Sequence, residues 1–259
     1  MIKRISAFLF VLLAFVTANA QDINHKLAKE LLIWGNSSIA QSLPLDFGLM
    51  SFDRIDIAEN SINYVYIIKD DAVFEEYSSI QDGLKDMLLD NFSQQISSMA
   101  TSLILHIDSD MMLNYDYCNT SGSKVTVTFT PEDMYKLLGK STIDPEFRAE
   151  SMTYLLSSAI ETISQDGPTQ IVLDYTDDEY YAFRMYADGL WEDGYKLDLK
   201  DIVISNFASN EPGKFFPVIS LYLGKGEKFT VEDRTAGKST SDEITYKELL
   251  DIYKTFSEN

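Results

Sequence analysis

The side chains best suited to nucleophilic chemistry in this sequence are Cys118 and His106, since the chain has one cysteine and two histidines. A thiol attacks a carbonyl efficiently only when a base lies within hydrogen-bond reach, roughly 3 Å. Alternating apolar residues predict strands at both positions, joined by a turn near residue 110. That register places Cys118 opposite Ser102, roughly 13 Å along the strand from His106. We therefore interpret Cys118 as an unreactive thiol and His106 as a solvent-facing sheet residue.

Phosphate-loop and metal motifs are incomplete in this sequence. Gly139-Lys140-Ser141 and Gly237-Lys238-Ser239 look like loop ends, but the required earlier glycine is replaced by Met134 and Glu232. The acidic segment 108–119 lacks the central glycine and the closing glutamate of a calcium-binding EF-hand loop. A single cysteine also excludes an intramolecular disulfide and a Cys₂His₂ metal site. We predict no cofactor and no metal site, and leave open only opportunistic calcium binding by an acidic turn.

Residues 175–195 are the richest in aromatic side chains, with seven in twenty-one positions against 12% for the whole chain. Aspartates and glutamates are interleaved with them. Aromatic faces beside carboxylates suit sugar rings, and tyrosine and tryptophan also concentrate at protein interfaces. The competing interpretation is that these rings form the core of an ordinary strand. Our predicted binding residues are Tyr180, Tyr186, Trp191 and Tyr195.

Two functions are favoured from these residues, and a structural role at the cell surface is a third possibility. The first is a non-enzymatic binding or interaction module whose partner is an unidentified protein or glycan. The alternative is a glycan-acting hydrolase that uses paired carboxylates, one as acid and one as base or nucleophile. Its candidates are Asp177 or Glu179 with Glu192, and the sequence does not set the distance between them.

The charge balance disfavours nucleic acid and anionic lipid as partners. Acidic residues number 41 against 21 basic ones, for a formal net charge of −20. Binding to nucleic acid or to anionic lipid requires clustered lysine and arginine, so both are disfavoured. A hydrophobic content of 45% nevertheless predicts a globular fold.

The first twenty residues have the pattern of a secretory signal peptide. Lys3 and Arg4 precede an apolar run over 7–16, and small residues lead to a cleavage site after Ala20. The run is too short to span a bilayer of about 30 Å, and no later segment comes near the roughly 18 apolar residues that a span needs, so we expect no stable membrane insertion. The sequence therefore predicts export to the periplasm or outside the cell.

The cleavage site also carries a resemblance. Ala18-Asn19-Ala20 followed by Gln21 resembles the cleavage sites of exported proteins from Bacteroides-type bacteria. The acidic, tyrosine-rich body with its Leu43-Pro44 dipeptide is similar to small exported proteins of unknown function from that group. The resemblance implies an exported location and no particular activity.

Hydrophobic periodicity predicts the elements that position these residues. Alternation at every second residue predicts strands over 51–58, 61–68, 102–108, 112–118, 124–129, 170–175, 179–187, 215–223 and 227–232. The strands over 102–129 form an antiparallel meander in this interpretation. Helical spacing predicts helices over 79–99, 131–138, 145–166 and 245–256, and the amphipathic stretch over 23–34 reads as a helix or a partly mobile arm. Residues 233–243 are polar and read as a flexible loop.

These elements predict an α+β fold, with antiparallel sheets and long amphipathic helices packed on one face. We divide the chain into a signal peptide (1–20), an N-terminal arm (21–42) and two α+β subdomains (43–140 and 141–259). Both halves run from a long helix through a hairpin to a helix capped by threonine, Thr130 or Thr245. That order indicates two similar subdomains, and one continuous domain is the alternative.

Overall fold

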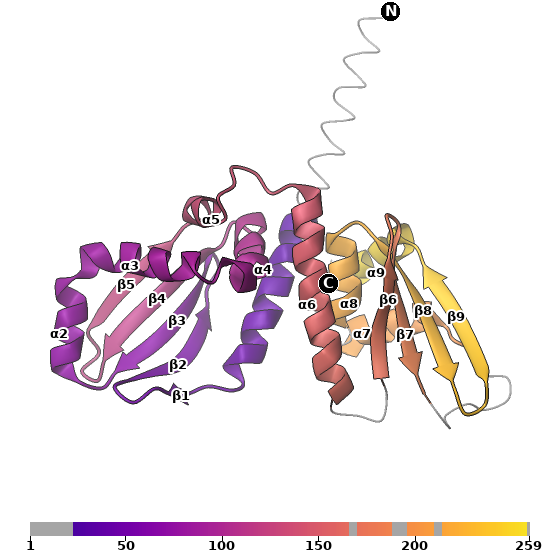
Figure 1. Cartoon of the computed structure of the whole chain (residues 1–259), viewed down its shortest axis with the longest axis horizontal. Helices are drawn as coiled ribbons and strands as arrows, with labels where there is room; N and C mark the ends of the chain where they lie inside the picture. Colours follow the sequence, from indigo (N-terminus) through magenta and orange to yellow (C-terminus); the bar gives the residue numbers. More distant parts are fainter. Residues whose placement is uncertain (1–22, 166–169, 188–195, 210–213, 258–259) are drawn as a thin grey trace, which may run out of the picture. The chain divides into compact units, whose positions relative to one another are not determined.

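The computed structural model describes residues 23–165, 170–187, 196–209 and 214–257 (Figure 1). It confirms the α+β class. The chain divides into two compact units, Met1–Asp144 and Pro145–Asn259, where the sequence placed a boundary between residues 140 and 141. The predicted signal peptide lies outside the described residues.

The first unit is a five-stranded sheet in the order β1-β2-β3-β4-β5, preceded by a helix over 23–40. Helices α2 to α5 pack on one face of the sheet (Figure 1), where they meet the apolar residues that alternate along β4 and β5. The elements are β1 Leu45–Asp46, β2 Met50–Ile57, β3 Ser61–Ile68, α2 Asp71–Ser79, α3 Gln81–Ser93, α4 Ile96–Asp108, β4 Met112–Asn119, β5 Lys124–Phe129 and α5 Pro131–Leu137.

The second unit is a four-stranded sheet in the order β6-β7-β8-β9. Helices α6 to α9 lie on one side of it, which leaves its other face open (Figure 1). The elements are α6 Pro145–Gln165, β6 Gln170–Thr176, β7 Tyr180–Tyr186, α7 Leu199–Ser209, α8 Phe215–Tyr222, β8 Gly226–Asp233, β9 Lys238–Ile244 and α9 Tyr246–Ser257.

The two sheets share one topology. In each, two antiparallel hairpins are joined by a parallel pair of central strands, β3 with β4 and β7 with β8, because helices connect the hairpins. Because the pairing is alike, a row of paired residues across the first sheet corresponds to a row across the second sheet. In the first unit the row is Ile57, Ile62, Leu113 and Phe129. In the second unit it is Thr176, Tyr181, Glu227 and Ile244.

The final helix of each unit begins with the same cap, directly after the last residue of this row. The Thr130 backbone N–H donates to the Asp133 carboxylate at 2.9 Å, and the Asp133 N–H donates back to the Thr130 hydroxyl at 3.3 Å. The corresponding distances between Thr245 and Glu248 are 3.0 and 3.3 Å. These reciprocal bonds satisfy backbone donors that a helix start leaves without partners. The two predicted threonine caps are confirmed.

Two predicted strands are helices. Residues 102–108 belong to α4 and residues 215–222 form α8. The residues Leu103–Ile107 of α4 and Pro217–Tyr222 of α8 are buried without interruption, so these segments lack the polar face by which a surface helix is identified. Within such a run, short apolar stretches alternate by chance and imitate a strand. The meander predicted for 102–129 is therefore wrong in its first strand, and the hairpin predicted for 215–232 is wrong in its first strand as well.

Two other predictions need correction. The single helix expected over 79–99 is interrupted at Ile80 and Gln95, where α2, α3 and α4 meet. The loop expected over 233–243 contains β9, a polar edge strand paired with β8. An edge strand has only one neighbour and exposes its side chains, so its sequence lacks the apolar alternation of a half-buried strand. The strands predicted over 51–58, 61–68, 112–118, 124–129, 170–175 and 179–187 are confirmed with small shifts at their ends.

Candidate functional site

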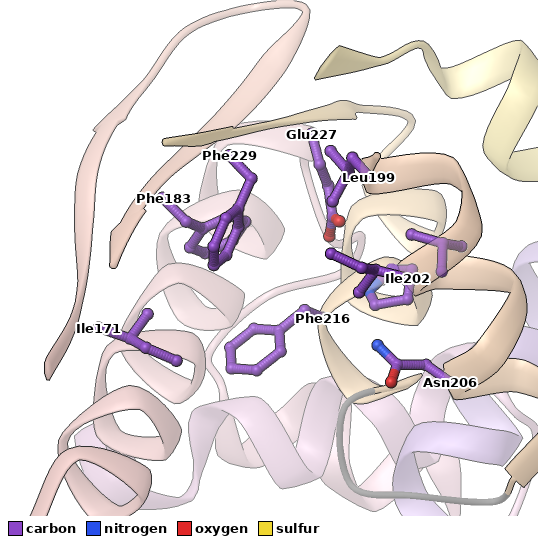
Figure 2. A pocket seen from close by; sticks show the side chains of 10 residues that line it. Ile171, Phe183, Leu199, Ile202, Asn206, Phe216, Glu227 and Phe229 are labelled. Atoms are coloured by element: carbon purple, nitrogen blue, oxygen red, sulfur yellow. The ribbon is translucent and has the colours of Figure 1, made fainter. Parts of the chain in front are cut away.

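The second unit contains a cavity of about 60 Å³ between the helix-covered face of its sheet and helices α7 and α8 (Figure 2). A water molecule needs roughly 10–15 Å³ by the same kind of measure, so the space admits a larger group. Its wall is apolar apart from one carboxyl and one amide. The lining residues are Ile171, Phe183, Leu199, Ile202, Val203, Asn206, Phe216, Pro217, Glu227 and Phe229.

Glu227 provides the carboxyl. It is the second residue of β8, and the pleat directs its side chain to the same face as Phe229, toward the helices. Only 3% of Glu227 is exposed. Its Oε1 accepts a hydrogen bond of 2.9 Å from the hydroxyl of Ser220, a fully buried residue of α8. Among the described residues, no lysine or arginine forms an ion pair with Glu227.

This environment changes the chemistry of the carboxyl. Removal from water disfavours the charged form and raises the pKa of Glu227 to about 7, while the Ser220 hydrogen bond opposes the shift. The group therefore gains or loses its proton near neutral pH, unlike an ordinary surface glutamate. A strongly shifted carboxyl in a cavity is a recognised marker of a functional site.

Three phenyl rings contribute to the wall. The Phe183 ring centroid lies 5.5 Å from that of Phe216 and 6.2 Å from that of Phe229. Figure 2 shows Phe183 and Phe229 together on one side of the space, with the Glu227 carboxyl on the other. Phe183 is 2% exposed and forms the floor, whereas Ile202 at the rim is 40% exposed. The cavity is thus open to solvent along α7 and closed beneath by the sheet.

The tyrosines predicted to bind lie on the opposite face of this sheet. Tyr180 and Tyr186 alternate with the buried Tyr181 and Phe183 along β7, and cations cover their rings. The Lys228 ammonium lies 4.3 Å from the Tyr180 ring centroid, and the Arg234 guanidinium lies 4.4 Å from that of Tyr186. Trp191 and Tyr195, the other two predicted residues, lie outside the described residues.

The same open face carries an ion network around Arg184. Its guanidinium donates to the Asp174 and Glu232 carboxylates at 2.8 Å each, and these bonds raise its already high pKa. Arg184 therefore links the two strands on either side of β7. The network balances charges within the sheet.

The pairing considered for glycan hydrolysis, Asp177 or Glu179 with Glu192, stays a prediction, and two of its three carboxylates lie in the described β6–β7 turn. Asp177 holds the β6–β7 turn, where its Oδ1 accepts bonds of 2.9 and 2.6 Å from the N–H groups of Glu179 and Tyr180. These bonds lower the pKa of Asp177, in the direction opposite to that of a general acid. Glu179 is exposed in the same turn, and Glu192 lies outside the described residues.

His106 differs from its prediction. It lies in α4, fully buried, and its Nδ1 donates to the Met111 carbonyl at 3.0 Å. Nε2 is buried without a partner, and burial lowers the pKa of His106 to about 4. The expectation of a solvent-facing sheet residue was wrong, because the strand over 102–108 is a helix. Burial raises the pKa of the Cys118 thiol, so Cys118 stays protonated and is a poor nucleophile at neutral pH.

The described part of the chain contains no group of three or more His, Cys, Asp or Glu residues placed to hold a metal ion. No helix there has the length and apolar character needed to cross a bilayer.

Comparisons with known proteins leave the family open. No family model matches the chain, and no curated protein matches it. Among solved structures, the chain is similar to a Pseudomonas aeruginosa protein described as a "putative secreted protein", with 15% sequence identity and a TM-score of 0.36. The similarity covers 43% of this chain and 96% of that protein. At this TM-score the two folds are not shown to be the same.

Sequence reasoning missed Glu227, although one signal was available. The residue precedes Phe229 and Val231 at alternate positions, on the strand face that the pattern assigns to the core. A charged residue on a core face is rare unless it is paired or functional. The cavity itself leaves no pattern in the sequence, because its lining residues come from five separate elements, β6, β7, α7, α8 and β8.

Proposed function

We propose that this protein is an exported, non-enzymatic binding protein that holds a small ligand in the cavity beside Glu227. One observation carries the proposal, namely a solvent-accessible aromatic cavity with a single buried carboxyl in its wall. Ligand sites of proteins are typically concave and apolar, with a few placed polar groups that orient the ligand. Export rests on the signal-peptide pattern of the first twenty residues.

The composition of the wall favours binding over catalysis. Among the described lining residues, Glu227 is the one titratable side chain. Acid–base hydrolysis of a glycoside needs a second carboxyl across the scissile bond, roughly 5–10 Å away. The nearby Ser220 hydroxyl already donates a hydrogen bond to Glu227. The cavity can therefore orient a ligand and balance its charge, and the proposed function is binding without hydrolysis.

The predicted role of Tyr180 and Tyr186 stays a prediction. These residues lie on the open face of the sheet, away from the cavity, so a protein or glycan could bind there independently. Lys228 and Arg234 already cover one side of their rings. A sugar stacking on either tyrosine would need the other side.

A fragment screen by protein NMR tests the proposal, with a mixture of small neutral and charged compounds. We expect at least one compound to shift the signals of Phe183, Phe216 or Phe229. Replacing Ile202 by Trp at the rim should block the mouth and abolish these shifts. Ile57→Trp is the matched control, because Ile57 has the same 40% exposure in the other unit. The proposal would be overturned if no compound shifted these signals in the wild type and lost that effect in Ile202→Trp.

A further inference from the structure

We propose that the ligand of this cavity is a small organic ammonium cation, held between the three phenyl rings and the Glu227 carboxylate. This inference rests on the proposed function, because it names the chemical class that the same cavity selects. Three features of the described residues point to it: an unpaired charge, the aromatic wall and the absence of that charge from the equivalent position in the other unit.

The first feature is the unpaired carboxylate. Burying a carboxylate without a cation is costly, and the one hydrogen bond it receives among the described residues, from Ser220, is neutral. A cation in the cavity would offset part of that cost. The overall charge of −20 also attracts cations toward the protein before they bind.

The second feature is the wall. Aromatic rings attract a cation through the negative potential of their faces, and this attraction is strongest when water is excluded. A hard metal ion needs about six oxygen ligands, whereas the described lining offers oxygen atoms only on Glu227 and Asn206 and in the backbone. An alkylated ammonium instead places methyl groups against Phe183, Phe216 and Phe229 and its charge near Glu227.

The third feature is that the fold does not require this carboxyl. Leu113 occupies the position equivalent to Glu227 in the first unit, where it pairs with Ile62 and Phe129 and is buried in the core. The same strand pairing is therefore built with an apolar residue elsewhere in this chain. A glutamate that the pairing does not need and that burial disfavours is best explained by a ligand.

The size of the cavity limits the buried part of the ligand. A volume of about 60 Å³ suits a compact, methylated ammonium head. The remainder of a larger ligand would leave past Ile202 and Phe216 at the rim, where both side chains are partly exposed.

The test is an NMR titration of the full chain with tetramethylammonium chloride, compared with tert-butanol, a neutral compound of similar size and shape. Sodium chloride at matched ionic strength controls for salt. At pH 8 we expect tetramethylammonium to shift the cavity signals and to bind more tightly than tert-butanol. Lowering the pH to 6 should weaken its binding about tenfold, because Glu227 then carries a proton.

Glu227→Gln should weaken the binding of tetramethylammonium at least about tenfold and leave the binding of tert-butanol unchanged. Glu243→Gln is the matched control, since Glu243 pairs with Lys228 on the open face and its loss changes the net charge equally. Equal tetramethylammonium affinity in the wild type and Glu227→Gln would overturn the inference. So would binding of tert-butanol alone, which would leave the proposed function intact. Binding of neither compound, with an empty fragment screen, would remove both.

Discussion

The two units of this protein build the same turn with different residues, and the difference separates a closed core from a cavity. In the first unit the Met111 N–H donates to the His106 carbonyl at 3.0 Å as α4 gives way to β4. In the second, the Lys225 N–H donates to the Ser220 carbonyl at 2.8 Å between α8 and β8. His106 and Ser220 therefore occupy equivalent positions.

A left-handed residue completes each turn, Asp110 with φ 49° and Gly224 with φ 74°. Two residues after the donor, the strands carry Leu113 and Glu227 at matched positions. The first unit thus combines a buried imidazole with an apolar strand residue. The second combines a small hydroxyl residue with a buried carboxyl, and the carboxyl faces a cavity. Equivalent backbones need not carry equivalent chemistry.

The two units should also respond to pH in opposite directions. Burial lowers the pKa of His106 to about 4 and raises that of Glu227 to about 7. Each group is neutral when its unit is most stable, because burial disfavours the charged form of both. Acid should therefore weaken the first unit and base the second.

The largest effect expected is that of Glu227→Leu, which gives the second unit the strand residue of the first. The pKa of Glu227 is about 7 in the folded protein and 4.5 ordinarily, so folding favours the protonated form. Its contribution is complete below pH 4.5 and is lost as the pH rises through 7, by about 3 kcal/mol. Glu227→Leu should recover that loss at pH 8. Urea unfolding and hydrogen exchange of the β8 amides, at pH 5 and pH 8, measure it.

Glu227→Gln provides the control for this change, since it preserves shape and removes the titration. Its stability difference from the wild type should grow between pH 5 and pH 8. A difference that stays constant over this range would show that Glu227 does not titrate near 7.

His106→Asn tests the first unit, with a smaller effect in the opposite direction. The folded pKa of about 4 lies below the ordinary 6.5, so the stability from neutral His106 is complete above pH 6.5 and is lost as the pH falls toward 4. Between pH 7 and pH 5 the loss is about 2 kcal/mol. Asparagine retains a donor for the Met111 carbonyl and does not titrate, so the variant should lack this loss in hydrogen exchange of the β4 amides. An unchanged acid response would contradict the assignment.

Gly226→Ala tests a packing difference between the two units at the residue before Glu227. A Cβ at Gly226 would lie 2.5 Å from the Ile244 carbonyl oxygen and 2.9 Å from the Tyr180 ring. The equivalent Met112, paired with Ser61, carries a side chain there without difficulty. We expect Gly226→Ala to destabilise the second unit by about 1–2 kcal/mol in urea unfolding.

Gly83→Ala in α3 is the control for the glycine substitution. No atom lies within 4 Å of its added Cβ, so alanine should stabilise that helix by about 0.5–1 kcal/mol. Equal effects of the two alanines would mean that β9 moves freely to accept the new methyl group.

The smallest effect is expected at the shared caps. Thr130→Ala and Thr245→Ala each remove the acceptor of one N–H at a helix start and should cost about 1 kcal/mol in urea unfolding. Thr255→Ala is the control, since its hydroxyl bonds to a carbonyl within α9. Unequal losses at the two caps would show that the two starts, alike in geometry, differ in energy.

Much of the fold could be predicted from local patterns. Alternation located β4 and β5 because one face of each is buried, and the Thr130 and Pro131 pair located the start of α5. The helices α4 and α8 could not be identified in this way. Leu103–Ile107 and Pro217–Tyr222 are buried without interruption, so the distinction between periods of 2 and 3.6 disappears there.

The site was less accessible to sequence reasoning. Aromatic density drew attention to Tyr180 and Tyr186, whereas the cavity lies behind the same strand, lined by Phe183 between them. Composition counts rings, but the strand pleat decides which face each ring occupies. Glu227 was detectable only as a charge at a core position.

The sequence by itself determined the charge, the signal-peptide pattern, the α+β class and the two caps, since each depends on residues close together in the chain. Only the tertiary structure decided that the central strands are parallel, that His106 is buried and that Glu227 faces a cavity. The reason is physical. The pKa of a carboxyl and the shape of a cavity depend on which distant side chains exclude water, and a linear pattern does not specify that exclusion.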